Sequence, residues 1–137
     1  MLKPILNLLS YVRSVFILFY GIFLTLSMSV LVVVTALLGG AKALLDFMII
    51  KMWSRPLLYP MGIDLEVRGT EHVRTDGKGF LILFNHTSAL DIPIMFGYFP
   101  RPFRFGAKVE LFKVPFFGKA MKAVGILPIN RGNRNQV

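Results

Sequence analysis

The sequence predicts an α/β domain in which a partial sheet is flanked by helices, preceded by an N-terminal membrane helix or helical hairpin. Residues 14–41 carry no charged side chain, and about 20 apolar residues are enough for a helix to cross a bilayer. After residue 56, short apolar runs alternate with helical spacings of apolar residues and are separated by glycine and proline. Such alternation is typical of a parallel or mixed sheet covered by helices.

The N-terminal region, residues 1–55, is predicted to associate with a membrane. The pair Gly39-Gly40 favours a break after the apolar run, so that residues 42–53 form a second helix along the interface. A transmembrane span and an in-plane hairpin both remain open. Three basic residues follow the apolar run and two precede it. This difference favours a cytoplasmic location for residues 56–137 at the inner membrane.

The region from residue 56 onward is predicted to hold three strands and two helices, in addition to a half-buried strand at Ile63–Val67 that alternates apolar and polar residues. An unbroken apolar run predicts a strand buried on both faces. Proline after Phe99 and glycine at position 125 predict where the helices end. The predicted elements are the strand Phe80–Phe84, the helix 91–99, the strand Phe103–Ala107, the helix Phe116–Val124 and the strand Ile126–Ile129.

His86 and Asp91 form the most informative pair, because they follow the predicted strand at Phe80–Phe84 directly. Open α/β folds usually bind their ligands at the carboxyl edge of the sheet, where this junction lies. A carboxylate that fixes the tautomer of an imidazole makes it a general base near neutral pH. Asn85 and Ser88 are expected to support the turn. The alternative is a helix cap, with His86 an ordinary exposed loop residue.

The basic excess is concentrated late in the chain, which contains 16 Lys and Arg against 7 Asp and Glu. An anionic partner is therefore expected, such as a phosphate, a lipid headgroup or a nucleic acid. After Pro100 only Glu110 opposes the basic side chains, which are Arg101, Arg104, Lys108, Lys113, Lys119, Lys122, Arg131 and Arg134.

Two further stretches of sequence, Gly106–Gly118 and Gly125–Arg131, resemble those of a known protein family. His86 and Asp91 form a His-x-x-x-x-Asp motif. A Gly-x-x-x-Ile-x-Arg motif follows, formed by Gly125, Ile129 and Arg131. With these two motifs the chain resembles the glycerol-phosphate acyltransferases. Within that family it is most similar to the bacterial 1-acylglycerol-3-phosphate O-acyltransferases. The resemblance covers roughly residues 56–134. The family's later motifs would follow Val137, so we expect residues 56–137 to be the N-terminal part of the domain.

The resemblance implies transfer of a fatty acyl group from acyl-CoA or acyl carrier protein to the free hydroxyl of 1-acylglycerol-3-phosphate, giving phosphatidic acid in phospholipid biosynthesis. His86 would be the general base, oriented by Asp91, and no acyl-enzyme would form. Arg131 and Lys108 would bind the substrate phosphate, and Gly125 would support the site. No cofactor is expected beyond the acyl donor as co-substrate.

Several other classes of function are excluded or less favoured. Without cysteine there is no disulfide framework, thiolate zinc site or cysteine nucleophile, and the two histidines lack the spacing of a metal site. A nucleic-acid partner is not expected, because the phenylalanines among the basic residues fall at core positions. The alternatives kept are another glycerophosphate or lysolipid acceptor, and a non-catalytic basic membrane adaptor. The expected partners are membrane lipids, lysophosphatidic acid and the acyl donor.

Overall fold

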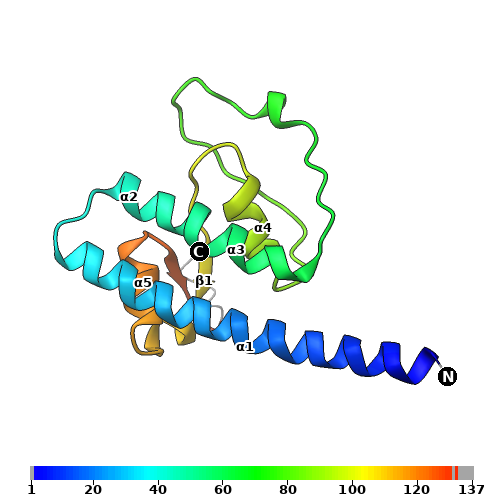
Figure 1. Cartoon of the computed structure of the whole chain (residues 1–137). Coiled ribbons are helices and arrows are strands. Elements are labelled where there is room, and N and C mark those ends of the chain that lie inside the picture. Colours follow the sequence, from blue (N-terminus) through cyan, green and yellow to red (C-terminus); the bar gives the residue numbers. More distant parts are fainter. Residues whose placement is uncertain (1, 131, 133–137) are drawn as a thin grey trace.

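The computed structural model describes residues 2–130 and residue 132, and it is mostly helical, with one small parallel sheet of two strands. Its longest element is α1 (Leu2–Leu37), whose C-terminal half packs against the rest of the chain while its N-terminal half projects away (Figure 1). Among the described residues, α1 is the one helix long and apolar enough to cross a membrane. The predicted N-terminal apolar helix is therefore present, and it begins well before residue 14.

A second helical arm folds back along α1 after a turn at Gly39, where a positive φ of 78° suits glycine. The break expected at Gly39-Gly40 and the helix after it are both present. Pro56 lies in the first turn of α3, where its missing N–H removes no helical hydrogen bond, so the arm continues past this residue. The arm consists of α2 (Lys42–Phe47), the π-helical η1 (Met48–Ser54), α3 (Arg55–Leu58) and the 3-10 turn η2 (Tyr59–Met61).

Polar contacts at three positions along α1 join the two arms of this helical hairpin, and the Arg13 Nη2 atom at the first of them contacts both Pro60 O and Met61 O. The sequence separation of the partners falls from 48 to 36 to 28 toward the turn, as an antiparallel pair of helices requires. The contacts are Arg13 Nη2 to Met61 O at 2.7 Å, Tyr20 Oη to Pro56 O at 3.1 Å, and Trp53 Nε1 to Thr25 Oγ1 at 3.1 Å.

The strands predicted at Ile63–Val67 and Phe80–Phe84 are wrong. Between Gly62 and Leu90 the chain forms a long loop whose one regular element is the 3-10 turn η3 (Thr70–His72) (Figure 1). An apolar run becomes a strand only where a neighbouring strand takes its backbone hydrogen bonds, and no described residue pairs with this segment. Leu81 and Leu83 are accordingly 83% and 86% exposed, so the run is not buried on both faces.

The sheet consists of β1 (Gly106–Lys108) and β2 (Leu127–Ile129), which run parallel with Gly106 opposite Leu127 and Lys108 opposite Ile129. Both strands are shorter than the sequence predicts, and the parallel pairing agrees with the prediction. A Cβ at Gly106 would lie 2.0 Å from the Cδ1 atom of Ile129, so a side chain at this position would displace the end of that isoleucine.

The core lies between the hairpin and the two helices that the apolar spacings predict, α4 (Asp91–Tyr98) and α5 (Phe117–Ala123). The 3-10 turn η4 (Val109–Lys113) connects β1 toward α5. Because α1 and the second arm both contribute to this core, the hairpin is packed directly on the part of the chain that follows it. The buried residues of the core are Val32, Leu45, Met48, Ile49, Phe96, Ala120 and Val124.

Candidate active site

The loop before α4 is organised around a single oxygen atom of Asp91, the first residue of that helix. Asp91 Oδ2 lies 2.9 Å from His86 Nδ1 and accepts hydrogen bonds from the backbone N–H groups of Thr87 and Ser88, each at 2.8 Å. The side chains of His86 and Asp91 are 48% and 23% exposed, so both can be reached from solvent. The structure thus brings together the two residues that the sequence analysis pairs.

The electrostatics of the loop favour an ionised Asp91. The backbone N–H of Ser88 contributes most to lowering the pKa of this carboxyl below its ordinary value, burial opposes it, and His86 and the backbone of Thr87 lower it further. An ionised carboxylate can only accept hydrogen bonds, so its contact with the neutral imidazole requires the proton on Nδ1. The Nε2 atom of His86 is then the free base.

The residues expected to support the turn differ in what they contact. Ser88 Oγ accepts a hydrogen bond from the backbone N–H of Leu90 at 3.1 Å, and Ser88 O accepts one from the N–H of Asp91 at 3.1 Å. Asn85 is exposed, and within the part of the chain that the structure describes its side chain makes no hydrogen bond to protein. Ser88 therefore shapes the loop, while Asn85 presents its amide to solvent.

Gly125 lies in the turn between α5 and β2 with a positive φ of 80°. A Cβ at this position would also approach the Nε atom of Arg104 to 3.0 Å. The guanidinium of Arg104 is held by Asp46 of α2, with Nη2 and Oδ1 2.6 Å apart. Gly125 therefore makes room for an ion pair that joins the hairpin to the sheet.

Of the two expected phosphate-binding residues, the structure describes Lys108, which lies at one edge of the sheet. Lys108 is the last residue of β1, is exposed, and stands opposite Ile129 at the end of β2. Because the strands are parallel, the chain that follows Ile129 leaves the sheet at the same edge as Lys108. Arg131 lies outside the described residues.

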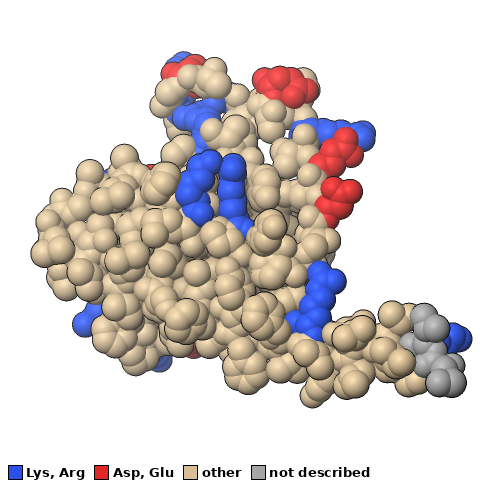
Figure 2. Space-filling view, viewed as in Figure 1, with Lys and Arg blue, Asp and Glu red and all other residues tan. Residues whose placement is uncertain are grey.

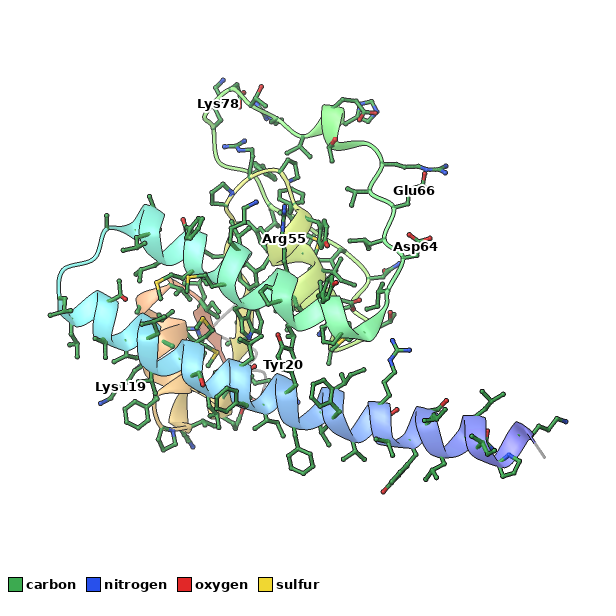
Figure 3. The ribbon with its side chains drawn as sticks, viewed as in Figure 1. Tyr20, Arg55, Asp64, Glu66, Lys78 and Lys119 are labelled. Carbon is green, nitrogen blue, oxygen red and sulfur yellow. The ribbon has the colours of Figure 1, made fainter. Side chains whose placement is uncertain are left out.

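The hairpin holds α4 through two side chains that no local motif marks. Ser54 is fully buried, and its Oγ donates to Pro93 O at 2.9 Å. Arg55 Nε donates to Gly97 O at 3.0 Å, and its guanidinium lies over the ring of Tyr98. Figure 3 labels Arg55 where the second arm passes α4. These contacts fix the helix that begins with Asp91.

An apolar cavity of about 740 Å³ lies between α1, η1, α4 and α5. Ala89 and Leu90 of the His86–Asp91 loop line one part of it, and Val32 of α1 and Met121 of α5 line others. Sequence analysis missed this cavity, because its walls come from segments far apart in the chain and no short pattern announces it.

Charged residues are unevenly spread over the surface. The loop after Gly62 carries acidic side chains on the side of the molecule away from α1, where Figure 3 labels Asp64 and Glu66 and Figure 2 shows the red atoms. The α1 surface in the same view is largely uncharged, with basic atoms near its N-terminal half (Figure 2). Within the described residues, no group of three or more His, Asp or Glu residues is placed to hold a metal ion.

Comparisons with known proteins agree on one family. Residues 64–137, the larger part of the chain, match the family model described as Acyltransferase. The chain is 30% identical over 90 residues to a chloroplastic 1-acyl-sn-glycerol-3-phosphate acyltransferase of Arabidopsis thaliana, covering 65% of this chain and 25% of that protein. It is 34% identical over 76 residues to the 1-acyl-sn-glycerol-3-phosphate acyltransferase of Helicobacter pylori, covering 56% of this chain and 30% of that protein.

A third relative aligns over more of the chain. A 1-acyl-sn-glycerol-3-phosphate acyltransferase of Chlamydomonas reinhardtii is 28% identical over 131 residues, covering 93% of this chain and 39% of that protein. The matches thus span between 25% and 39% of the length of these three relatives. No solved structure matches the chain.

Proposed function

This chain belongs to the acyltransferase family, and from that premise we propose that it serves in transfer of a fatty acyl group to the free hydroxyl of 1-acylglycerol-3-phosphate, giving phosphatidic acid. The proposed donor is acyl-CoA or acyl carrier protein. Relatives named as 1-acyl-sn-glycerol-3-phosphate acyltransferases support the acceptor. The observation that carries the chemistry is the 2.9 Å contact between His86 Nδ1 and Asp91 Oδ2 beside an apolar cavity.

In the proposed reaction His86 acts as the general base. The acceptor hydroxyl gives its proton to Nε2 while its oxygen attacks the thioester carbonyl carbon. The carbon–sulfur bond then breaks, and the thiolate leaving group takes the proton back from the imidazolium. Asp91 remains ionised, keeps the proton on Nδ1 and stabilises the imidazolium, so no enzyme nucleophile is needed.

The phosphate of the acceptor is proposed to bind at the sheet edge where Lys108 ends β1. Arg131, which the family motif places just beyond β2, is the proposed partner, because a guanidinium can make two parallel hydrogen bonds to one phosphate. This part of the proposal rests on the motif and on the parallel register of β1 and β2.

The apolar cavity is the proposed site for a fatty acyl chain. Its lining includes side chains of the His86–Asp91 loop, so a chain bound there would have its carbonyl end near the imidazole. Burying hydrocarbon stabilises such binding by about 0.8 kcal/mol per CH₂ group. The cavity also lies against α1, the helix with the most exposed apolar surface.

Membrane association through α1 is the remaining part of the proposal. Large apolar side chains are exposed along this helix from Ile5 to Leu37, which is unfavourable in water. The charged long loop lies away from α1, and the surface of α1 in that view is largely uncharged (Figure 2). We propose that α1 contacts the inner membrane and that the His86–Asp91 loop faces the cytoplasm.

A transfer assay with the full chain in phospholipid vesicles tests the proposal. His86→Ala is compared with His72→Ala, because His72 is the other histidine and lies exposed on the long loop. We expect the His86 variant to lose transfer by about 10²-fold or more and the His72 variant to match the parent chain. Equal rates for the His86 variant and the parent would refute the base assignment.

The same assay separates the alternatives. Glycerol-3-phosphate and other lysophospholipids are offered in parallel with 1-acylglycerol-3-phosphate, so that the preferred acceptor is read directly. Vesicle binding without transfer to any acceptor, from acyl-CoA or from acyl carrier protein, would refute the enzymatic proposal for this chain and favour a basic membrane adaptor.

A further inference from the structure

We propose that Phe84 is a positioning residue for His86, fixing the plane of the imidazole so that Nε2 faces the acceptor hydroxyl. The inference rests on the proposed function, in which Nε2 takes the proton. The ring of Phe84 contacts the imidazole with centroids 5.9 Å apart and planes inclined by 61°. This edge-to-face arrangement is a favourable geometry for aromatic pairs.

The contact with Asp91 restrains the imidazole but leaves its ring some freedom. A hydrogen bond at Nδ1 limits rotation of the ring about the Cβ–Cγ bond only within the angular tolerance of that hydrogen bond. Turning the ring moves Nε2, which lies on its far side. A second contact on the ring is therefore needed to hold the base in one direction.

Phe84 is itself anchored to the core through Phe105. The ring centroids of Phe84 and Phe105 lie 5.6 Å apart. Phe105 in turn packs on the buried core residue Phe96, with ring centroids 5.2 Å apart. The backbone of Phe105 is held as well, since its carbonyl accepts the N–H of Leu127 at 2.9 Å. Phe84 thus connects the exposed imidazole to the rigid part of the molecule.

The segment before His86 gives this anchor its importance. It forms no strand, so no ladder of backbone hydrogen bonds holds it. Leu81 and Leu83 point into solvent, whereas Phe80 and Phe84 are each 39% exposed. Phe80 packs on Phe99 and does not contact His86, which makes it a matched control for Phe84.

The test reads the imidazole directly by NMR of the full chain, with ¹³C,¹⁵N-labelled histidine, in lipid nanodiscs. A His72→Gln background leaves His86 as the only histidine. We expect Phe84→Leu to increase the motion of the His86 ring in relaxation measurements, Phe84→Tyr to restore the parent motion, and Phe80→Leu to leave it unchanged. The indole signal of Trp53, the only tryptophan, reports whether each variant keeps its fold.

Transfer kinetics supply the second measurement. We expect Phe84→Leu to lower kcat about 10-fold or more with little change in KM for the acceptor, and Phe84→Tyr to recover most of the rate, because misplacing a base by about 1 Å is costly. Unchanged motion of the His86 ring in Phe84→Leu overturns the proposal, and so does increased ring motion with parent-like kcat. If the parent chain transfers no acyl group, the proposed function fails, and the NMR result still decides whether Phe84 orients the imidazole.

Discussion

At the scale of the residue, one carboxylate oxygen of Asp91 organises the candidate site. It accepts three donors, two from the backbone of the loop and one from His86. The same atom therefore caps the loop before α4 and sets the histidine tautomer. The helix cap offered as the alternative is not formed, because no side chain caps α4 and the N–H groups that Asp91 accepts belong to the loop before the helix.

Replacing Asp91 with asparagine tests the tautomer. The amide keeps the size of the side chain but removes its charge, so the preference for a proton on Nδ1 of His86 weakens. We expect transfer to fall about 10²-fold or more, with acceptor KM changed less than kcat. The ¹⁵N shifts of the imidazole measure the tautomer, and an unchanged Nδ1–H population in the variant would contradict this role.

The lowered pKa of Asp91 also predicts how stability depends on pH. Because the folded-state pKa lies below the ordinary value of 3.8, the unfolded chain takes up its proton first as the pH falls. The contribution of this group is thus present above about pH 4 and is lost as the pH falls through the folded-state pKa. Thermal unfolding in detergent should show a shallower acid decline for Asp91→Asn than for the parent, while equal slopes would argue against the shift.

At the scale of the element, the ion pair of Asp46 and Arg104 joins α2 to the segment before β1. The two side chains are 16% and 19% exposed, and Arg104 Nε is buried without a partner among the described residues.

The helices were predictable from sequence because apolar spacing and terminal prolines are local signals. The strand predicted at Phe80–Phe84 does not form, since a strand depends on a pairing neighbour that a local pattern cannot reveal.

Removing one member of this pair should be more harmful than removing both. Asp46→Ala leaves a mostly buried guanidinium without its counter-charge, and we expect it to lower the free energy of unfolding by about 3 kcal/mol. Adding Arg104→Met removes the stranded charge and should recover part of this loss. Chemical unfolding of the single and double variants in detergent measures both effects, and a double variant less stable than Asp46→Ala would contradict the explanation.

Gly125 offers a second prediction at this scale. Alanine here must adopt a positive φ, which is unfavourable by about 1–2 kcal/mol, and its Cβ would press on Arg104. We expect Gly125→Ala to destabilise the chain by at least that amount. Gly77, with a positive φ but open space around it, is the control that isolates the backbone effect. Equal losses at the two positions would show that contact with Arg104 contributes nothing.

At the scale of the whole molecule, α1 belongs to two environments. Val32, in its C-terminal half, is part of the core, while large apolar side chains remain exposed along its length. The apolar run predicted this helix, yet only the fold shows that it also forms a wall of the apolar cavity. Of the candidate site, sequence identified His86 and Asp91 through their spacing, whereas Ser54, Phe84 and the cavity depend on contacts between distant segments.

The exposed surface of α1 leads to a prediction for membrane binding. Phe19 and Phe23 are 65% and 71% exposed, and a carboxylate carried into the hydrocarbon region is unfavourable by about 2.5–3.5 kcal/mol. We expect Phe19→Asp or Phe23→Asp to weaken binding to phosphatidylglycerol-containing vesicles by about 100-fold in a sedimentation assay. Leu83→Asp, the control on the long loop, should bind like the parent, and an equal loss there would contradict binding through α1.

The polar contacts of the helical hairpin restrict where the chain tolerates changes in length. An extra residue inserted between Tyr20 and Thr25 would rotate one part of α1 by about 100° relative to the other, so the Tyr20 and Trp53 contacts could no longer form together. An insertion at Gly39-Gly40 leaves every contact in register. Natural variation in hairpin length should therefore accumulate at the turn and in the part of α1 that precedes Arg13, with the paired stretch between them constant in length.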